Sequence, residues 1–162
     1  MLTRPATLNR GEIERRIPHQ GSMCLLDAVL AWDDDAITCE ARSHQAPDNP
    51  LRAHGRLGAA CGVEYAAQAM AVHGALVGES QNADAHGTPP RAGYLASLRS
   101  VDLHVERLDA VPGPLTISAQ RITGDANTVL YSFNVNDGPR ELLSGRAVVV
   151  LDAAALGRKA TP

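Results

Sequence analysis

The sequence predicts an α+β domain in which an antiparallel sheet curls around one long, buried helix. The helix is predicted over Leu57–Val77, a stretch without proline whose only charged side chain is Glu64. At about 1.5 Å per residue it would be roughly 30 Å long. A helix that is apolar on all sides is a buried helix. Strand patterns before and after this stretch supply a sheet to cover it, which makes an α+β domain.

The first part of the chain is predicted to form a short helix followed by two strands. Asn9 followed by Glu12 is a capping-box pattern, which predicts that a helix begins here. Pro18 ends that helix. The loop after Pro18 leads into an apolar strand that ends at Trp32, and Ala36–Arg42 alternates weakly as a second strand.

The regions around the long helix are predicted to be loops and strands. A polar loop over Ser43–Arg56 leads into the helix, and Gly78–Pro90 is predicted to be a mobile surface loop. The tail Asp152–Pro162 is expected to be frayed or a short surface helix. We find no repeat and predict one domain over residues 1–162. The later strands are predicted over Arg91–Val105, Leu115–Ile122, Val129–Asn136 and Glu141–Leu151.

Composition and charge exclude several classes of function. A net charge of −3 and a pI of about 6.0 argue against a nucleic-acid-binding surface. The residues before Gly11 lack the apolar core of an export signal, so we expect a cytoplasmic protein. The three cysteines have no metal-ligand spacing, so we expect reduced thiols, no metal and no cofactor. Glu64 and Gln68 argue against a membrane-spanning helix.

Glu64 is the most informative residue of the sequence. A carboxylate in apolar surroundings is costly unless it is paired. Glu64 is therefore either a functional group or a residue at the helix rim that stabilises the N-terminal end of the helix dipole. Gln68 lies one turn later on the same face. It could hydrogen-bond the Glu64 carboxylate, or it could be an ordinary interface amide.

Several motifs together are similar to a known family of enzymes. The chain resembles the hotdog-fold 3-hydroxyacyl-[acyl-carrier-protein] dehydratases over roughly residues 9–151. The motifs that carry this resemblance are Ile17-Pro18-His19, Leu25-Leu26-Asp27, His44 in a polar loop, and Gly62–Ala69. The motifs that resemble the aryl-polyene-pathway dehydratase-like branch more closely are Asn49–Arg52, Gly55–Leu57 and Glu64–Ala71.

The resemblance implies a sheet wrapped around the central helix, and a dimer whose sheets join edge to edge. It also implies two active sites at the dimer interface, where a histidine of one subunit faces a helix carboxylate of the other. Glu64 matches the carboxylate. The family histidine lies in a His-Phe-Pro-Gly-like motif, but its position is Pro50 here and the motif is absent. We favour His44 as the catalytic histidine because it follows a predicted strand, as the family histidine does. His54, or neither residue, is the alternative.

The implied activity is the dehydration of 3-hydroxyacyl thioesters on acyl-carrier protein to trans-2-enoyl thioesters, in fatty-acid or polyene biosynthesis. The partners would be the phosphopantetheine-bearing carrier and either a second copy or a related dehydratase subunit. The alternatives are a hotdog acyl thioesterase and a non-catalytic subunit of a dehydratase heterodimer.

The remaining candidates would bind substrate or support the site. Free N–H groups at the helix start would stabilise an enolate-like charge, with glycines keeping that approach open. His19 is expected to be a structural anchor of its loop near the site, and His73 to complement the C-terminal end of the helix dipole. The predicted substrate-binding residues are Arg52, His54, Gly55, Gly62 and Gln68.

Overall fold

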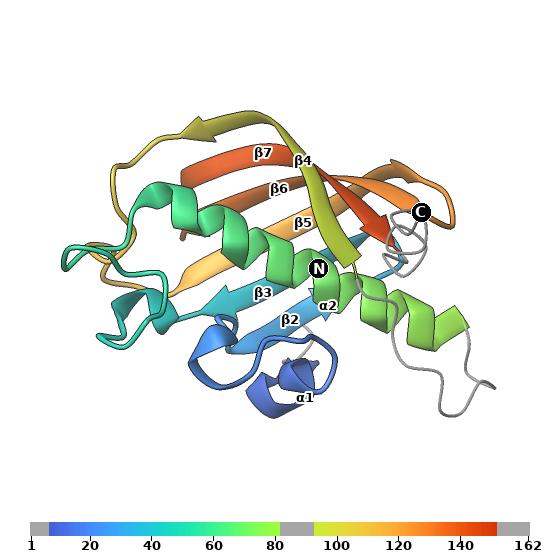
Figure 1. The fold of residues 1–162 in the computed structure, drawn as a ribbon, viewed down its shortest axis with the longest axis horizontal. Coiled ribbons are helices and arrows are strands. Elements are labelled where there is room, and N and C mark those ends of the chain that lie inside the picture. The colour runs from blue at the N-terminus through green and yellow to red at the C-terminus, as the bar shows by residue number, and fades with distance from the viewer. Residues whose placement is uncertain (1–6, 82–92, 152–162) are drawn as a thin grey trace, which may run out of the picture.

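A computed structural model describes residues 7–81 and 93–151 of the chain, in which one long helix lies across a seven-stranded sheet (Figure 1). The order of the strands in the sheet is β1-β2-β3-β5-β6-β7-β4, and every neighbouring pair is antiparallel. The sequence predicts the antiparallel sheet and the one long helix, but neither the order of the strands nor the short β1. The strands are β1 (Leu8–Asn9), β2 (Ala28–Trp32), β3 (Ala36–Ala41), β4 (Gly93–Leu103), β5 (Leu115–Gly124), β6 (Thr128–Asp137) and β7 (Arg140–Leu151).

The helices of the described residues are the short α1 (Arg10–Glu14) and the long α2 (Gly62–Gln81). The predicted capping box at the start of α1 is confirmed. The Asn9 side chain accepts a hydrogen bond from the Glu12 N–H at 3.0 Å, and Glu12 Oε2 accepts one from the Asn9 N–H at 2.9 Å. Three single 3₁₀ turns lie between these elements, over Gly21–Met23, Ser43–Gln45 and Ala59–Cys61.

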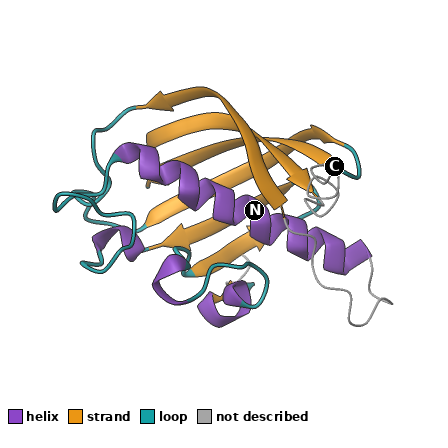
Figure 2. Cartoon of the chain, viewed as in Figure 1, coloured by secondary structure: helices purple, strands orange, loops and turns teal. Residues whose placement is uncertain are grey.

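The core lies between α2 and one face of the sheet (Figure 2). Successive side chains of a strand point to opposite faces, and on β6 the buried ones alternate as Val129, Tyr131, Phe133 and Val135. The start of α2 packs against β7 so closely that a Cβ at Gly62 would overlap the Leu143 side chain. A side chain at Gly62 would therefore force Leu143 to shift, whereas the backbone at Gly62 has an ordinary φ of −60°.

The ends of α2 differ from the prediction. The helix begins at Gly62 and not at Leu57, because the preceding segment bonds to another part of the chain. The Leu57 carbonyl accepts a hydrogen bond from Leu108 at 2.8 Å, and the Ala59 N–H donates to Glu106 at 3.0 Å. At its other end the helix continues to Gln81, so the prediction of a loop from Gly78 is wrong for its first residues.

His73 does not lie at the end of the helix, so its predicted interaction with the helix C-terminus is wrong. Its ring is 1% exposed and packs edge-on against the Tyr131 ring. Both ring nitrogens form hydrogen bonds, Nδ1 with the Tyr131 hydroxyl at 2.7 Å and Nε2 with the Asp33 carbonyl at 2.8 Å. His73 is therefore a hydrogen-bonded core residue.

Some predictions lie outside the described residues. These are the tail from Asp152 and most of the loop predicted before Pro90. The single domain over residues 1–162 stays a prediction for the same reason. Within the described ranges, no helix has the length and apolarity needed to cross a membrane.

Strand β4 forms one edge of the sheet and exposes large apolar side chains. It pairs with β7 on one side and with no described strand on the other. Four of its side chains, Tyr94, Leu95, Leu98 and Leu103, are between 41% and 54% exposed. An exposed apolar edge is a template for pairing with another chain.

Candidate active site

The structure brings Glu64, Gln68 and His19 together at the first turns of α2. Glu64 Oε1 lies 3.2 Å from His19 Nε2 and accepts a hydrogen bond from Gln68 Nε2 at 3.3 Å. The side chains of Glu64 and His19 are 39% and 28% exposed, whereas Gln68 is buried. Of the two interpretations of Gln68, the hydrogen bond to the Glu64 carboxylate is observed, and the binding of substrate by Gln68 stays a prediction.

The loop that carries His19 is held in place by contacts of residues before and after His19 in the sequence. Before it, the Ile17 side chain is buried in the core. After it, the Arg10 guanidinium donates hydrogen bonds to the carbonyls of Gly21 at 2.8 Å and Cys24 at 2.6 Å. These contacts fix the path of the loop, so the position of the imidazole beside Glu64 follows from long-range packing.

His44, the histidine predicted to be catalytic, is fully buried in its own subunit. Its Nε2 lies 3.1 Å from the Val111 carbonyl, and its Nδ1 has no hydrogen-bond partner among the described residues. Burial lowers the pKa of His44 below its usual value. Among the residues that the structure describes, the histidine that contacts Glu64 is His19. Pairing of His44 with Glu64 across a subunit boundary stays a prediction.

The predicted substrate-binding residues before α2 form hydrogen bonds or turns within their own loop. Arg52 donates from Nε to the Ala46 carbonyl at 2.9 Å and from Nη2 to the His44 carbonyl at 3.4 Å. His54 and Gly55 form a tight turn in which both have positive φ angles, 53° and 75°. No hydrogen bond or ion pair given by the described residues links these three residues to Glu64, so their substrate contacts remain predictions.

The helix start differs from the predicted oxyanion-binding site. The Ala59–Cys61 3₁₀ turn uses N–H groups that an α-helix would leave free. The Ala59 N–H donates to Glu106, and the Cys61 N–H donates to the Gly58 carbonyl at 3.0 Å. The Gly62 N–H donates back into the turn. These three N–H groups are therefore engaged within the chain, and stabilisation of an enolate by other N–H groups of the helix start stays a prediction.

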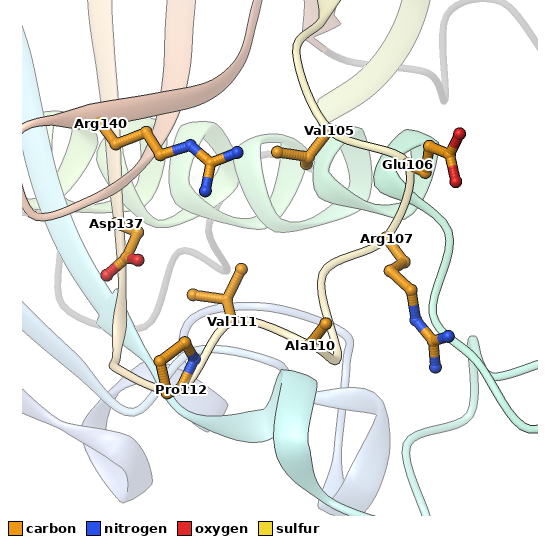
Figure 3. A pocket seen from close by; sticks show the side chains of 8 residues that line it. All are labelled: Val105, Glu106, Arg107, Ala110, Val111, Pro112, Asp137 and Arg140. Atoms are coloured by element: carbon orange, nitrogen blue, oxygen red, sulfur yellow. The ribbon is translucent and has the colours of Figure 1, made fainter.

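Two surface cavities lie away from Glu64. The larger, of about 340 Å³, lies between the β4–β5 connection and the β6–β7 turn (Figure 3). In Figure 3 the Arg140 guanidinium points across it toward Val105, whereas Glu106 points away. Arg107, also in its wall, is paired with Asp109, and this guanidinium holds the Asp109 pKa below its usual range. The smaller, of about 280 Å³, is lined by Arg10, Ser22, Asp27, Arg42, Ser43, Ala46, Asp48 and Asn49.

Neither cavity brings a histidine beside a carboxylate. The Glu64–His19–Gln68 cluster is therefore the best candidate for acid–base chemistry. Sequence reasoning placed His19 near the site but treated it as a loop anchor. The available signal was its place in the Ile17-Pro18-His19 motif, which gave no indication of where the ring would point.

Solved structures with the same fold include a dehydratase and several thioesterases. The dehydratase heterocomplex ApeI:P from Xenorhabdus doucetiae matches with a TM-score of 0.76 at 19% identity, over 92% of this chain and 97% of the matched chain. A mutant of the thioesterase PA1618 from Pseudomonas aeruginosa matches with a TM-score of 0.57 at 17% identity, over 93% and 98% of the two chains. A hypothetical thioesterase with coenzyme A from Streptococcus pneumoniae matches with a TM-score of 0.53 at 12% identity, over 76% and 83%.

At such low identities the structural similarity establishes the fold alone, and it confirms the predicted hotdog fold. None of the curated protein sequences matches the chain. The ApeP-like family model, described as ApeP dehydratase, matches residues 11–156, which is most of the sequence. The chain therefore belongs to the ApeP-like family of dehydratases.

Proposed function

We propose that this protein dehydrates 3-hydroxyacyl thioesters carried on acyl-carrier protein to trans-2-enoyl thioesters, in aryl-polyene or fatty-acid biosynthesis. The observation that carries the proposal is the Glu64 carboxylate, partly exposed at the first turn of α2 and in contact with His19 and Gln68. Because the chain belongs to a dehydratase family, dehydration is the reaction that we assign to this carboxylate.

The chemistry requires proton transfer at two neighbouring carbons. A base removes a proton from C2 of the acyl chain, and an acid protonates the hydroxyl that leaves C3. A carboxylate is suited to both tasks when one of its oxygens is open to the substrate. His44 of a neighbouring subunit is the competing second group, as the family resemblance implies.

The site is completed by a second hotdog subunit bound at the β4 edge. The exposed apolar side chains of β4 and its unpaired backbone edge support this arrangement. The structure from Xenorhabdus doucetiae is a dehydratase heterocomplex, so a related dehydratase subunit is the partner we propose first and a second copy is the alternative. The free thiols of all three cysteines are consistent with a reducing compartment such as the cytoplasm.

The test is turnover of a 3-hydroxyacyl-carrier substrate, followed by mass spectrometry for the loss of one water. The protein is assayed alone and with a related dehydratase subunit. Glu64→Gln should reduce the rate by about 100-fold or more, since general acid–base catalysis contributes roughly that much. Glu79→Gln is the matched control, because Glu79 lies on the same helix and is exposed, and among the described residues it pairs with Arg16.

Each other outcome identifies a different function. Release of the free acid, with no loss of water, would indicate a thioesterase. Dehydration that occurs only with the partner and is unchanged by Glu64→Gln would indicate a non-catalytic subunit. Either result would overturn the proposal.

A further inference from the structure

Two arginines lie directly opposite each other at the rim of the sheet, where β4 runs beside β7 (Figure 1). Arg99 of β4 and Arg146 of β7 are partners in the strand register, and both side chains are exposed. They point to the outer face, because the next residue of β7, Ala147, is buried in the core. Opposite side chains of an antiparallel pair have Cβ atoms about 4.5–5.5 Å apart, so like charges at such a pair repel each other.

The described part of the chain does not neutralise these two charges. None of the ion pairs formed by the described residues involves Arg99 or Arg146. Further across the sheet, Arg146 is followed by Ser132 on β6 and Gln120 on β5, which are uncharged. Asp102 lies on the same face further along β4, and it too forms no ion pair with a described residue. Two unpaired positive charges therefore lie beside the free edge of the sheet.

Arg99 also lies next to the middle of β4. The strand runs from Gly93 to Leu103, so its central residue is Leu98. If a second copy paired along the whole strand, Leu98 would lie opposite its own counterpart. The two Arg99 side chains would then be diagonal neighbours on the outer face, about 7–8 Å apart. This separation is close to the screening length of about 8 Å at physiological ionic strength, so salt would screen the repulsion only in part.

The inner face of the same edge is apolar. Leu95, Leu98 and Leu103 lie opposite buried residues of β7, yet they are 41%, 41% and 48% exposed. Burial of such side chains favours association with any hotdog subunit that brings a matching apolar face. Charge, in contrast, discriminates between partners, because like charges brought together across an interface weaken the wrong complex.

We propose that Arg99 and Arg146 select the subunit that joins the β4 edge. They disfavour a second copy of this chain, and they favour a hotdog subunit that presents carboxylates on the outer face of its own edge strand. This inference rests on the proposed pairing at the β4 edge, and it specifies the charge that the partner carries there.

The test uses a charge-reversed copy of this chain, Arg99→Glu with Arg146→Glu, as a partner of known charge. Native mass spectrometry of its 1:1 mixture with the ¹⁵N-labelled unmodified protein measures the mixed and the unmixed dimers. The mixed dimer should be about 10-fold tighter than the dimer of the unmodified protein. Sodium chloride at about 1 M should remove most of this difference, because it shortens the screening length to about 3 Å.

The matched control is a copy with Arg15→Glu and Arg140→Glu, which has the same net charge as the charge-reversed copy. Both arginines are exposed. Arg15 follows α1, and Arg140 precedes the residues of β7 that pair with β4. Mixtures of this control with the unmodified protein should contain no excess of mixed dimers. An excess equal to that of the charge-reversed copy would show that net charge, and not the arginine pair, selects the partner.

Arg146→Glu alone tests the like-charge contact within one subunit. It places a carboxylate opposite Arg99, so the unfolding temperature at low protein concentration should rise. Arg146→Lys keeps the charge and should leave that temperature close to the original. A lower unfolding temperature for Arg146→Glu than for Arg146→Lys would mean that the two arginines do not repel each other.

Three further results would overturn the inference. One is a dimer of the unmodified protein that is as tight as the mixed dimer, and another is the absence of any dimer in every mixture. The third is that the charge-reversed copy binds a related dehydratase subunit as tightly as the unmodified protein does. All of these measurements are made without substrate. Their failure would leave the proposed dehydration by Glu64 standing, and a protein without dehydratase activity would still show the selection by charge.

Discussion

Helix α2 carries two polar clusters with opposite designs. Glu64, in its first turn, has one oxygen held by His19 and Gln68 and one oxygen without a described partner. His73 lies about two and a half turns further along, where both ring nitrogens are bonded and the ring is 1% exposed. A buried polar group whose hydrogen bonds are all satisfied stabilises the fold, as His73 does. A partly exposed group with an unbonded atom, such as Glu64, can react with a substrate.

In the His73 cluster each hydrogen-bond donor meets an acceptor. The Asp33 carbonyl can only accept, so Nε2 carries the ring proton and Nδ1 accepts from the Tyr131 hydroxyl. Burial lowers the pKa of His73 and raises the pKa of Tyr131 to about 12. Both groups are therefore neutral near pH 7, as this pattern of donors and acceptors requires.

The largest expected effect on stability comes from His73→Leu. The change leaves the Tyr131 hydroxyl and the Asp33 carbonyl without their buried partner, and we expect a loss of about 2–4 kcal/mol in the free energy of unfolding. His19→Leu is the comparison, and should cost less than about 1 kcal/mol because its pair with Glu64 is partly exposed. Urea denaturation followed by circular dichroism measures both. Equal losses of unfolding free energy in the two variants would show that the two clusters do not differ in their contribution to stability.

A smaller effect is expected from pH. Burial lowers the pKa of His44 and of His73, in each case from an ordinary value of 6.5. Above pH 6.5 both histidines are neutral in the folded and the unfolded chain, so their contribution to stability is complete. As the pH falls below 6.5 the unfolded chain takes up protons first, and stability decreases by at most about 1.4 kcal/mol per pH unit for each histidine.

Denaturation at pH 7.5 and pH 5.5 checks this sign. The difference between the two free energies should shrink in His73→Leu, where one of the two histidines is gone. A protein that is equally stable at both pH values would show that burial of these rings has no thermodynamic consequence.

The elements of the fold were predictable because they depend on local chemistry. The capping box at Asn9 and the strand pattern over Val129–Asn136 are short-range patterns, and the structure has an element at each. The start of α2 was not predictable in the same way. The segment before Gly62 is as apolar as the helix itself, but it forms hydrogen bonds to residues 106–109 that are far away in the sequence.

The candidate site was half predictable. Glu64 and Gln68 stand one turn apart on a helix, so their contact follows from helix geometry. The position of His19 depends on hydrogen bonds between Gln68 and residues more than 40 positions earlier in the chain. The burial of His44 depends similarly on Val111, 67 residues away. No local pattern distinguishes the ring that reaches Glu64 from the ring that enters the core.

The smallest expected changes in stability concern two glycines of α2, one near each cluster. Gly62→Ala should destabilise the protein by about 1 kcal/mol or more, because its Cβ would overlap the Leu143 side chain and overpacking costs about 1–3 kcal/mol. Gly74→Ala adds a Cβ with no other atom within 4 Å. It should stabilise the helix by roughly 0.5–1 kcal/mol, since alanine has the higher helix propensity. Urea denaturation of the two variants should therefore give opposite signs. A gain at Gly62 would mean that Leu143 moves aside easily, and that the close packing of α2 against β7 does not hold Glu64 rigidly in place.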